Sequence, residues 1–343
     1  MQALVLAGGE GTRLRPLTLD VPKPVLPLAG RPFLTFLLGW ARRHGVDDVV
    51  LSCGFLSEGV ERVLGDEWEG MRIRYVHEDE PLGTGGPLRL AHDEGLLDER
   101  LVMLNGDVLT DFDLTAQLAQ HERTGALGTL ALAAVEDTAS YGVVPTGEDG
   151  QVEAFLEKQV GKAPTNRINA GCYVLEREIA ERVEPGRAVS MEREVFPQLA
   201  GGNGLYGWLA EGYWIDIGTP ERYLESTYDL LAGRVASDLP ERDASASLVY
   251  EGADVGGATV GPESVVGRDT RVGAGSVVER SVLHDRVTVG QGCGLSGCIV
   301  ATGATVEDGA RVEPRAVIGS GAVVAAGATV PSDARVQPGE RVA

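Results

Sequence analysis

The sequence predicts an α/β domain built on a mostly parallel sheet, followed by a parallel β-solenoid. Residues 1–135 alternate short apolar runs with helical stretches, which is typical of a parallel sheet covered by helices. From Val249 to Val336 an aliphatic residue recurs every six residues, with three gaps of five. That period fits neither a helix nor a hairpin, and its sixteen positions make about five triangular coils.

The elements of the first domain follow in order. Strands are expected over 3–7, 49–53, 72–78, 100–107 and 127–135, and helices over 32–44, 58–65, 83–95 and 113–125. From residue 140 the pattern changes to two hairpins, over 141–158 and 205–218, and a helix over 219–233 closes the domain. We therefore expect one domain over 1–234, a polar linker over 235–247 and the solenoid over 248–343.

Composition narrows the class of protein. The net charge of −21 argues against nucleic acid as a partner, because phosphate backbones bind basic surfaces. No run of 18 apolar residues predicts a membrane span, and the start does not resemble a signal peptide. Four cysteines at no metal-like or disulfide-framework spacing predict free thiols and a reducing cytoplasm. They are Cys53, Cys172, Cys293 and Cys298.

The segment "LAGGEGTRLRPLTLDVPKP", residues 6–24, predicts a phosphate-binding loop after the first strand. The amides of Gly8, Gly9 and Gly11 can approach phosphate oxygens closely, and Arg13 and Arg15 can add forked donors. Lys23 stands between two prolines in a chain with only three lysines against 27 arginines. A rigidly held ammonium is a compact point charge, which suits a clamp on a phosphoryl group.

Two carboxylates suggest a metal site. Asp107 follows a buried strand, and Asp216 lies in the predicted hairpin over 205–218. Each alone is more often a turn residue, but Mg²⁺ is commonly held by one or two carboxylates together with substrate phosphates. Thr84, in the glycine-rich stretch 80–86, suits either a ligand contact or the N-cap of the helix that follows.

Motifs spread over nearly the whole chain carry a family resemblance. The segment from Leu6 to Pro32, "LAGGEGTRLRPLTLDVPKPVLPLAGRP", resembles the signature of sugar-nucleotide pyrophosphorylases. The stretches "EPLGTGGPLRLA", "VMLNGDVL", "YGVV", "INAGCYVLE", "SMEREVFPQL" and "GYWIDIGTPERYL" are most similar to mannose-1-phosphate guanylyltransferases. The resemblance implies a Rossmann-like nucleotidyltransferase domain followed by a left-handed parallel β-helix of hexapeptide repeats.

The resemblance also implies the site. A sugar 1-phosphate would attack the α-phosphorus of a nucleoside triphosphate, GTP and mannose 1-phosphate being favoured, and pyrophosphate would leave. The implied catalytic cations are Arg13 and Lys23, and the implied Mg²⁺ ligands are Asp107 and Asp216. The nucleotide would lie against Leu6, Gly8, Gly9, Gly11, Thr12, Gly83 and Thr84. The sugar phosphate would lie against Gly142, Glu157, Lys158 and Asn169.

Three other functions stay open on the residues alone. The substrates could be glucose 1-phosphate with a thymidine or uridine triphosphate. A non-catalytic sensor of sugar nucleotides would need none of the cations and carboxylates. An acetyltransferase on the solenoid would need a general base, and His284 is the only histidine there. The simpler expectation is that the solenoid assembles a homo-oligomer.

Overall fold

The computed structural model describes residues 1–157, 163–239 and 247–343. They form two compact units. The first unit joins Met1–Gly9 to Leu37–Trp214, and the second joins Glu10–Phe36 to Ile215–Ala343. Lys158, and residues 240–246 of the predicted linker, lie outside the described residues.

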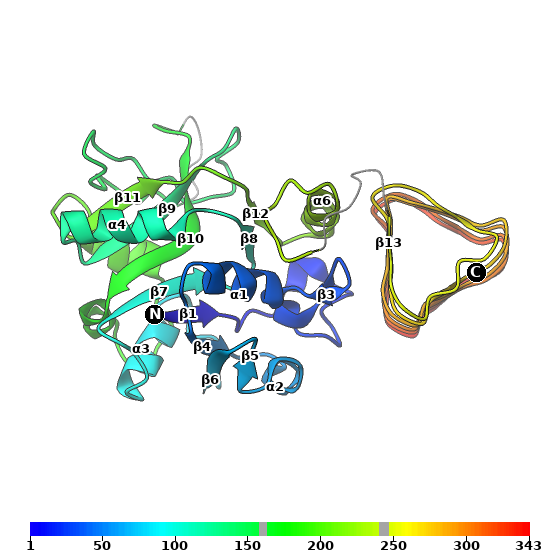
Figure 1. Ribbon diagram of the computed structural model, residues 1–343, viewed down its shortest axis with the longest axis horizontal. Coiled ribbons are helices and arrows are strands. Elements are labelled where there is room, and N and C mark those ends of the chain that lie inside the picture. Colours follow the sequence, from blue (N-terminus) through cyan, green and yellow to red (C-terminus); the bar gives the residue numbers. More distant parts are fainter. Residues whose placement is uncertain (158–162, 240–246) are drawn as a thin grey trace. The chain divides into compact units, whose positions relative to one another are not determined.

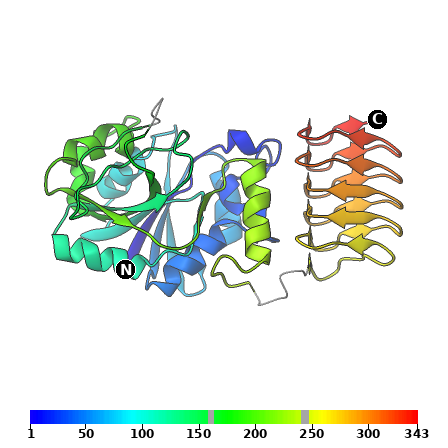
Figure 2. The ribbon, with the colours of Figure 1, turned by 90° about the horizontal axis from the view of Figure 1, so that it is seen from above.

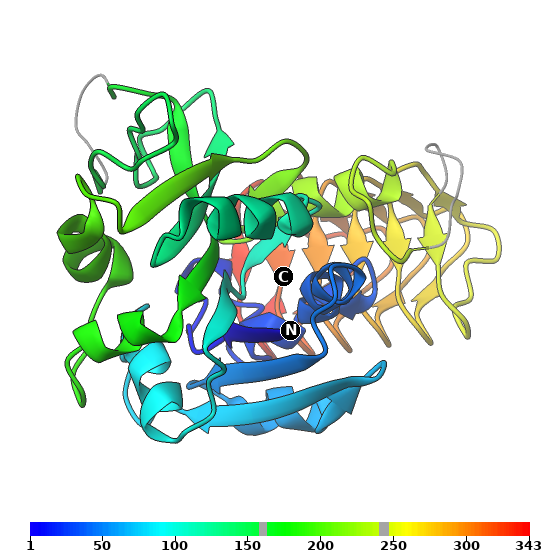
Figure 3. The same ribbon diagram turned by 60° about the vertical axis from the view of Figure 1, so that its left-hand side comes forward.

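A mixed eight-stranded sheet forms the centre of the first unit, in the order β11-β9-β10-β7-β1-β4-β6-β5 (Figures 1 and 3). Its strands are β1 (Gln2–Leu6), β4 (Asp48–Cys53), β5 (Glu67–Trp68), β6 (Met71–His77), β7 (Arg100–Asn105), β9 (Gly128–Ala134), β10 (Arg167–Glu176) and β11 (Leu205–Leu209). Strands β7, β1, β4 and β6 run parallel, whereas β10 is antiparallel to both neighbours. The predicted mixed, mostly parallel sheet is thus confirmed.

The predicted helices are present as α1 (Leu34–Arg43), α2 (Ser57–Leu64), α3 (Gly86–Asp93), α4 (Leu114–Thr124) and α6 (Pro220–Leu231). The short helix α5 (Phe196–Leu199) was not predicted. Local sequence sets the bounds of α4: the Asp113 carboxylate accepts from Ala116 N at 3.1 Å, and Gly125 ends the helix at φ 60°. Among the described residues, no helix has both the length and the apolar character needed to cross a bilayer.

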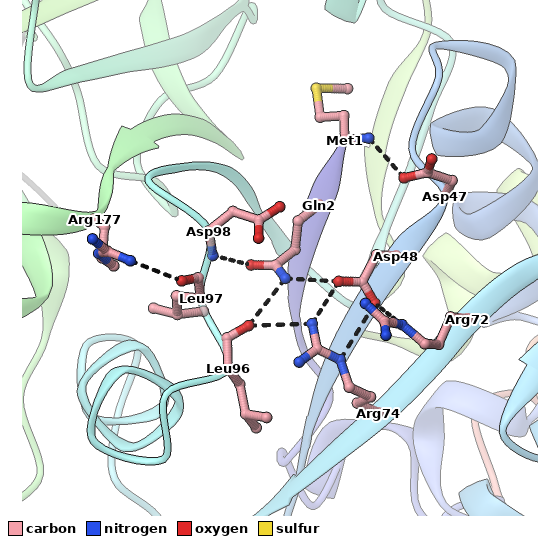
Figure 4. Close-up of polar contacts among 10 residues, drawn as sticks. All are labelled: Met1, Gln2, Asp47, Asp48, Arg72, Arg74, Leu96, Leu97, Asp98 and Arg177. Carbon is pink, nitrogen blue, oxygen red and sulfur yellow. Dashed lines mark hydrogen bonds and ion pairs between the residues drawn. The ribbon is translucent and has the colours of Figure 1, made fainter.

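A polar cluster ties together the amino ends of the central strands (Figure 4). Gln2 Nε2 donates to Asp48 Oδ2 at 2.8 Å, and Arg74 Nη2 donates to the same oxygen at 2.5 Å. Arg72 Nε donates to Asp48 Oδ1 at 2.9 Å, so one buried carboxylate receives bonds from three side chains. This edge of the sheet is closed by side chains of the chain itself, which leaves the carboxyl edge for a ligand.

One predicted hairpin is wrong. Residues 205–218 do not fold back on themselves, because β11 pairs in parallel with β9 and β12 (Trp214–Asp216) is not part of that sheet. The reason is a competing partner: Tyr213 N donates to Asp111 Oδ1 at 2.6 Å, and Asp111 N donates to Tyr213 O at 3.3 Å. The other hairpin has the antiparallel bridges that it requires, Val143 with Leu156 and Thr146 with Val152.

The second unit contains a parallel β-helix, which Figure 1 shows end-on as a triangle and Figure 2 from the side. Its first sheet holds β13 (Leu248–Val249), β15 (Val265–Val266), β18 (Val282–Leu283), β21 (Ile299–Val300), β24 (Val317–Ile318) and β27 (Arg335–Val336). The second holds β14 (Thr259–Val260), β17 (Val277–Glu279), β20 (Gly294–Ser296), β23 (Arg311–Val312) and β26 (Thr329–Val330). The third holds β16 (Arg271–Val272), β19 (Thr288–Val289), β22 (Thr305–Val306), β25 (Val323–Val324) and β28 (Arg341–Val342).

The hexapeptide period sets the coil length. Val249 pairs with Val266 and Leu283 with Val300, whereas Val300 pairs with Ile318, so early coils take 17 residues and later ones 18. The gaps of five in the sequence account for the shorter coils. Aliphatic residues of the repeat fill one interior core, from Val266 to Val336. The predicted solenoid is therefore present as stacked three-sided coils.

The buried cysteines of the β-helix lie at coil corners. Ser281 Oγ accepts from Cys298 N at 3.2 Å, and Ser276 Oγ accepts from Cys293 N at 2.9 Å, each across one 17-residue coil. All four cysteines of the chain are buried free thiols. Burial raises the pKa of Cys298 to about 12, so this thiol is inert rather than reactive.

The segment Glu10–Phe36 of the second unit contains short elements before α1 begins at Leu34. They are η1 (Thr12–Leu14), η2 (Lys23–Val25), β2 (Pro27–Leu28) and β3 (Arg31–Pro32). Other short elements of the described residues are β8 (Val108–Thr110), η3 (Arg177–Arg182) and η4 (Met191–Val195).

Candidate functional site

The phosphate-loop glycines of the first unit, Gly8 and Gly9, directly follow a central strand of the sheet, β1. β1 lies between β4 and β7, and Gly106 N donates to Leu6 O at 2.9 Å where β1 ends. A Cβ on Gly8 would lie 2.6 Å from Glu78 Oε1, so this glycine is required by a neighbouring carboxylate. Nothing lies within 4 Å of a Cβ on Gly9, which leaves its backbone open to an approaching ligand.

Glu78 ties the ends of two strands to the loop 80–86, a role that the sequence did not reveal. It directly follows β6, its Oε1 accepts from Ser52 Oγ at 2.6 Å, and Ser52 belongs to β4. Its Oε2 accepts from Leu82 N at 2.9 Å, at the start of the loop 80–86. The carboxylate therefore fixes that loop against Gly8, at the carboxyl edge of the sheet.

The glycine-rich loop is further held by the chain before η4. Gly83 has φ 73°, and its Cβ would lie 2.5 Å from Val189 O, so only glycine fits there. Gly85 N donates to Val189 O at 2.8 Å, and Val189 N donates to Leu82 O at 2.9 Å. These reciprocal backbone bonds make the loop a rigid element rather than a mobile one.

The side chain of Thr84 does not cap the helix that follows, since Gly85 occupies the N-cap position of α3 without a side-chain bond. Thr84 Oγ1 instead donates to Glu192 Oε2 at 2.5 Å and accepts from Met191 N at 2.9 Å. Ser190 Oγ donates to the same Glu192 oxygen at 2.8 Å. The helix-cap alternative for Thr84 is thus excluded, and Glu192 becomes the partner that positions it.

A hydrogen-bond chain continues from Glu192 to the predicted sugar side. Tyr173 OH donates to Glu192 Oε1 at 3.3 Å and accepts from Asn169 Nδ2 at 2.7 Å. Burial, and then the Glu192 charge, hold the pKa of Tyr173 well above its ordinary value, so the phenol stays protonated and can donate. Thr84 and Asn169 are therefore linked through two intermediate side chains.

Three of the predicted sugar-phosphate residues lie together. Asn169 N donates to Gly142 O at 2.9 Å, and a Cβ on Gly142 would lie 3.1 Å from Glu157 Oε2. Glu157 Oε1 lies 3.6 Å from Arg193 Nη2, an ion pair on the side of η4. The fourth predicted residue, Lys158, lies outside the described residues.

Asp107 is half-buried and lies just after the end of β7. Two glycines in this region, Gly106 and Gly171, are closely packed against neighbouring atoms. A Cβ on Gly106 would lie 2.5 Å from Leu6 O, and one on Gly171 would lie 2.6 Å from Asn105 Nδ2. Asn105 Oδ1 is buried and has no hydrogen-bond partner among the described residues. A hard oxygen donor therefore accompanies the Asp107 carboxylate at this strand end.

The other half of the predicted site belongs to the second unit. Gly11 has φ 61° and starts η1, and its Cβ would lie 3.0 Å from Thr18 Cγ2 and 3.2 Å from Lys23 Cβ. Thr18 Oγ1 donates to Gly11 O at 2.8 Å, which closes the loop around Thr12. Lys23 is half-buried and starts η2 directly after Pro22. The loop thus presents Lys23 from a short, well-defined turn.

Arg13 and Asp216 meet at a glycine. A Cβ on Gly218 would lie 2.6 Å from Arg13 Nη2 and 3.2 Å from Asp216 Oδ2. Arg15 differs from Arg13, because its guanidinium pairs with Glu10 at 2.9 Å on the surface. The structure therefore distinguishes the two arginines of the loop, and it supports Arg13 as the one directed to the predicted site.

No group of three or more histidine, cysteine, aspartate or glutamate side chains within the described residues could enclose a metal by itself. Any ion at Asp107 or Asp216 would need further oxygen ligands, which substrate phosphates supply in sites of this kind. The buried histidines serve other purposes: His121, for example, lies between Thr129 Oγ1 at 2.9 Å and Glu176 Oε1 at 3.1 Å.

Comparison with known families places both parts of the chain. The nucleotidyl transferase family matches residues 2–233, and the GMPPB C-terminal domain matches residues 245–342. Mannose-1-phosphate guanylyltransferase of Mycobacterium tuberculosis is 43% identical over 298 residues, which cover 85% of this chain and 82% of that protein. Mannose-1-phosphate guanylyltransferase 1 of Arabidopsis thaliana is 35% identical, over 93% of this chain and 91% of that protein.

Two further relatives extend the comparison. The mannose-1-phosphate guanylyltransferase catalytic subunit beta of Danio rerio is 36% identical, over 93% of this chain and 91% of that protein. Among solved structures, HddC from Yersinia pseudotuberculosis complexed with GMP-PN matches with a TM-score of 0.56 and 29% identity. That match covers 65% of this chain and 96% of the HddC chain.

Proposed function

Because this chain belongs to the nucleotidyl transferase family, whose members it matches along nearly its whole length, we propose that it makes a nucleoside-diphosphate sugar from GTP and mannose 1-phosphate. The observation that carries this proposal is the rigid cluster at the carboxyl edge of the sheet. Open glycine backbone follows β1, the loop 80–86 is locked by Glu78 and Glu192, and Asp107 follows β7. The names of the relatives favour the substrate pair.

The reaction joins two anions. An oxygen of the sugar 1-phosphate attacks the α-phosphorus of the triphosphate, the bond from that phosphorus to the bridging oxygen breaks, and pyrophosphate leaves. Catalysis of this kind relies on alignment and on neutralisation of charge. We assign the neutralising role to Arg13 and Lys23, since Arg13 lies beside Asp216 and Lys23 is presented by η2.

The remaining roles concern the nucleoside, the phosphates and the sugar. Thr84 and Gly83 suit the nucleoside, because Glu78 and Glu192 fix their loop. The phosphates would lie against the backbone of Leu6, Gly8, Gly9, Gly11 and Thr12. Gly142, Glu157 and Asn169, which lie together, suit the sugar hydroxyls, and Lys158 suits the sugar phosphate.

We assign a Mg²⁺ ion to Asp107 and Asp216, whose carboxylates are of the kind that Mg²⁺ prefers. Within the first unit, the buried Asn105 Oδ1 has no hydrogen-bond partner in the described chain and offers a further oxygen near Asp107. When bound, the ion would neutralise charge on the phosphates. Asp107 and Asp216 would hold it, while Arg13 and Lys23 contribute charge independently of it.

A substrate panel tests the proposal. The purified protein is incubated with each of GTP, ATP, UTP and dTTP, paired with mannose 1-phosphate or glucose 1-phosphate, and released pyrophosphate is measured. The highest kcat/KM is expected for GTP with mannose 1-phosphate. A clear preference for dTTP or UTP with glucose 1-phosphate would replace the proposed pair, and no pyrophosphate from any pair would overturn the proposed activity.

We also propose that the β-helix assembles copies of the chain in the cytoplasm. Two of its valines expose large apolar surface, Val249 at 41% and Val277 at 38%. Buried free thiols at all four cysteines agree with a reducing compartment. Light scattering of the purified protein tests the assembly, and a monomer at micromolar concentration would contradict it.

A further inference from the structure

A small hairpin lies directly after the segment that presents Lys23. β2 and β3 pair Pro27 with Pro32 and Leu28 with Arg31, and Leu26 O accepts from Phe33 N at 3.0 Å. Two strands of two residues, each containing a proline without an N–H, are too short to be stable alone. The hairpin therefore depends on contacts from outside itself.

Three of those contacts come to carbonyl oxygens of the hairpin, all within the second unit. Tyr223 OH, on α6, donates to Pro27 O. Tyr250 OH, directly after β13, donates to Ala29 O at 2.6 Å. Arg268 Nη1, in the next coil of the β-helix, donates to Gly30 O at 3.2 Å. The hairpin turn is thus held by hydrogen bonds from α6 and from two successive coils.

The turn is shaped for this contact. Ala29 and Gly30 both have positive φ, 44° and 74°. A two-residue hairpin turn of type I′ requires positive φ at both positions. A Cβ on Gly30 would lie 2.1 Å from Tyr250 Cε2, so the tyrosine ring occupies the space that any other residue would need. The Arg268 guanidinium lies over that ring, 4.7 Å from its centroid, which orders both side chains.

His284 supports the contact between Tyr223 and Pro27 from inside the β-helix. Its Nε2 lies 3.0 Å from Tyr223 OH, and the phenol uses its single proton for Pro27 O. The imidazole must therefore be the donor in this pair, which fixes the proton on Nε2. His284 is buried, so its ring sets the direction in which Tyr223 donates.

We propose that Tyr250 and Arg268, together with Tyr223 and the His284 that orients it, are positioning residues for Lys23, acting through the β2–β3 hairpin. The link is short. Leu26 N donates to Lys23 O at 3.1 Å, and Leu26 O accepts from Phe33 N, directly after the hairpin. The role of Lys23 itself rests on the proposed function. On this view the β-helix is part of the catalytic apparatus, in addition to any role in assembly.

The test compares variants in which tyrosine hydroxyls are removed by substitution with phenylalanine. The double variant Y223F/Y250F deletes two hydroxyls that reach the hairpin. The matched control is Y228F, because Tyr228 OH, also on α6, donates to Arg280 O of the β-helix but not to the hairpin. Steady-state kinetics, thermal unfolding and hydrogen exchange of the peptide containing residues 23–33 are measured on the full-length variants.

In Y223F/Y250F, kcat should fall about tenfold or more at saturating substrates, since a small displacement of a catalytic cation is costly, and exchange in residues 23–33 should accelerate. In Y228F both should match the wild type. A kcat within twofold of the wild type in the double variant would overturn the proposal. An equal loss in Y228F would also overturn it, because general attachment of α6 would then explain the effect.

The two proposals fail separately. If the wild type releases no pyrophosphate from any substrate pair, the proposed function fails, and hydrogen exchange alone decides whether the hairpin is held as inferred. Unchanged exchange of residues 23–33 in Y223F/Y250F would then overturn the positioning proposal as well.

Discussion

At the scale of single residues, Lys23 bears the strongest chemical prediction. It is the only one of the three lysines that the described residues include, and η2 presents it from between two prolines. The variant K23A should fold normally and lose at least about a hundredfold in kcat, because removal of one preorganised charge donor costs roughly 2.7–4 kcal/mol of barrier. Pyrophosphate release and the thermal midpoint are the two measurements.

The control for this experiment is R15A. Arg15 lies in the same loop, yet its guanidinium pairs with Glu10 on the surface, so its loss should change kcat less than about threefold. A K23A enzyme with near-normal turnover would remove Lys23 from the proposed mechanism. An equal loss of kcat in R15A would mean that the loop needs positive charge in general and not Lys23 in particular.

Glu192 carries the second prediction at this scale. Its carboxylate accepts from Thr84, Ser190 and Tyr173, and a glutamine amide would direct N–H groups at one of these donors. Glu192 is half-buried, and loss of an acceptor for enclosed donors costs about 1–3 kcal/mol, so E192Q should lower kcat/KM by roughly tenfold, mainly through KM for the triphosphate. The exposed Glu178 provides the control, E178Q, and equal KM values in both variants would refute the role of Glu192.

The sequence predicted some of these residues and not others for a physical reason. Gly8 and Gly83 stand out because a glycine cluster after a strand is itself a signal. Glu78 and Glu192 gave no such signal, since their partners, Ser52 and Thr84, lie 26 and 108 residues away. A single carboxylate in a charged segment looks like a solvated side chain until the fold brings its donors to it.

At the scale of elements, the amino ends of β1, β4 and β6 depend on one carboxylate. Burial by itself raises the pKa of Asp48, but hydrogen bonds from Arg72, Gln2 and Arg74 outweigh it and hold the pKa below its ordinary 3.8. The folded state thus gains stability from the ionised carboxylate above that pH. This contribution should be lost as pH falls through the lower pKa of the folded state.

The variant D48N should therefore destabilise the first unit by about 2 kcal/mol between pH 5 and 8, the usual value of a hydrogen bond to a charged group. The difference from the wild type should shrink below pH 4. Urea unfolding followed by tryptophan fluorescence is the measurement, because the chain's four tryptophans all lie in the first unit. A difference that persists unchanged at pH 3.5 would contradict the assignment. The exposed D47N serves as control.

Prediction from sequence was uneven between elements. The six-residue period gave the coils of the β-helix and even their change from 17 to 18 residues, because each coil repeats the same local burial. The hairpin predicted over 205–218 failed, because β11 found a parallel partner in β9 and Tyr213 found Asp111. Pairing of distant strands leaves no periodic trace in the sequence.

At the scale of the whole molecule, the domain predicted over 1–234 and the compact units differ in two segments, Glu10–Phe36 and Ile215–Arg234. Glu10–Phe36 belongs to the same compact unit as the β-helix, although it lies at the start of the chain. Its contacts with Tyr250 and Arg268 are made through backbone carbonyls, which every residue type carries. The side chains of that segment therefore form no pattern that could have predicted its partner. Only the structure shows why residue 30 is glycine: the Tyr250 ring leaves no room for a Cβ.

The last prediction concerns the acid sensitivity of the second unit. Burial lowers the pKa of His284 from 6.5 to about 4, with Asp285 opposing the shift, while Tyr223 OH and Thr270 contact the residue without charge. Above pH 6.5 the ring is neutral in both states and contributes nothing to the pH dependence. Between pH 6.5 and 4 only the unfolded state takes up the proton, so stability falls as pH falls, by about 3 kcal/mol in all.

H284N keeps an N–H donor for Tyr223 and should remove this part of the pH dependence, as measured by calorimetry of the β-helix transition. H77N, at a half-exposed histidine, should leave it intact. If wild type and H284N lose stability in parallel between pH 6.5 and 4, His284 is not the titrating group, and acid acts on the second unit elsewhere.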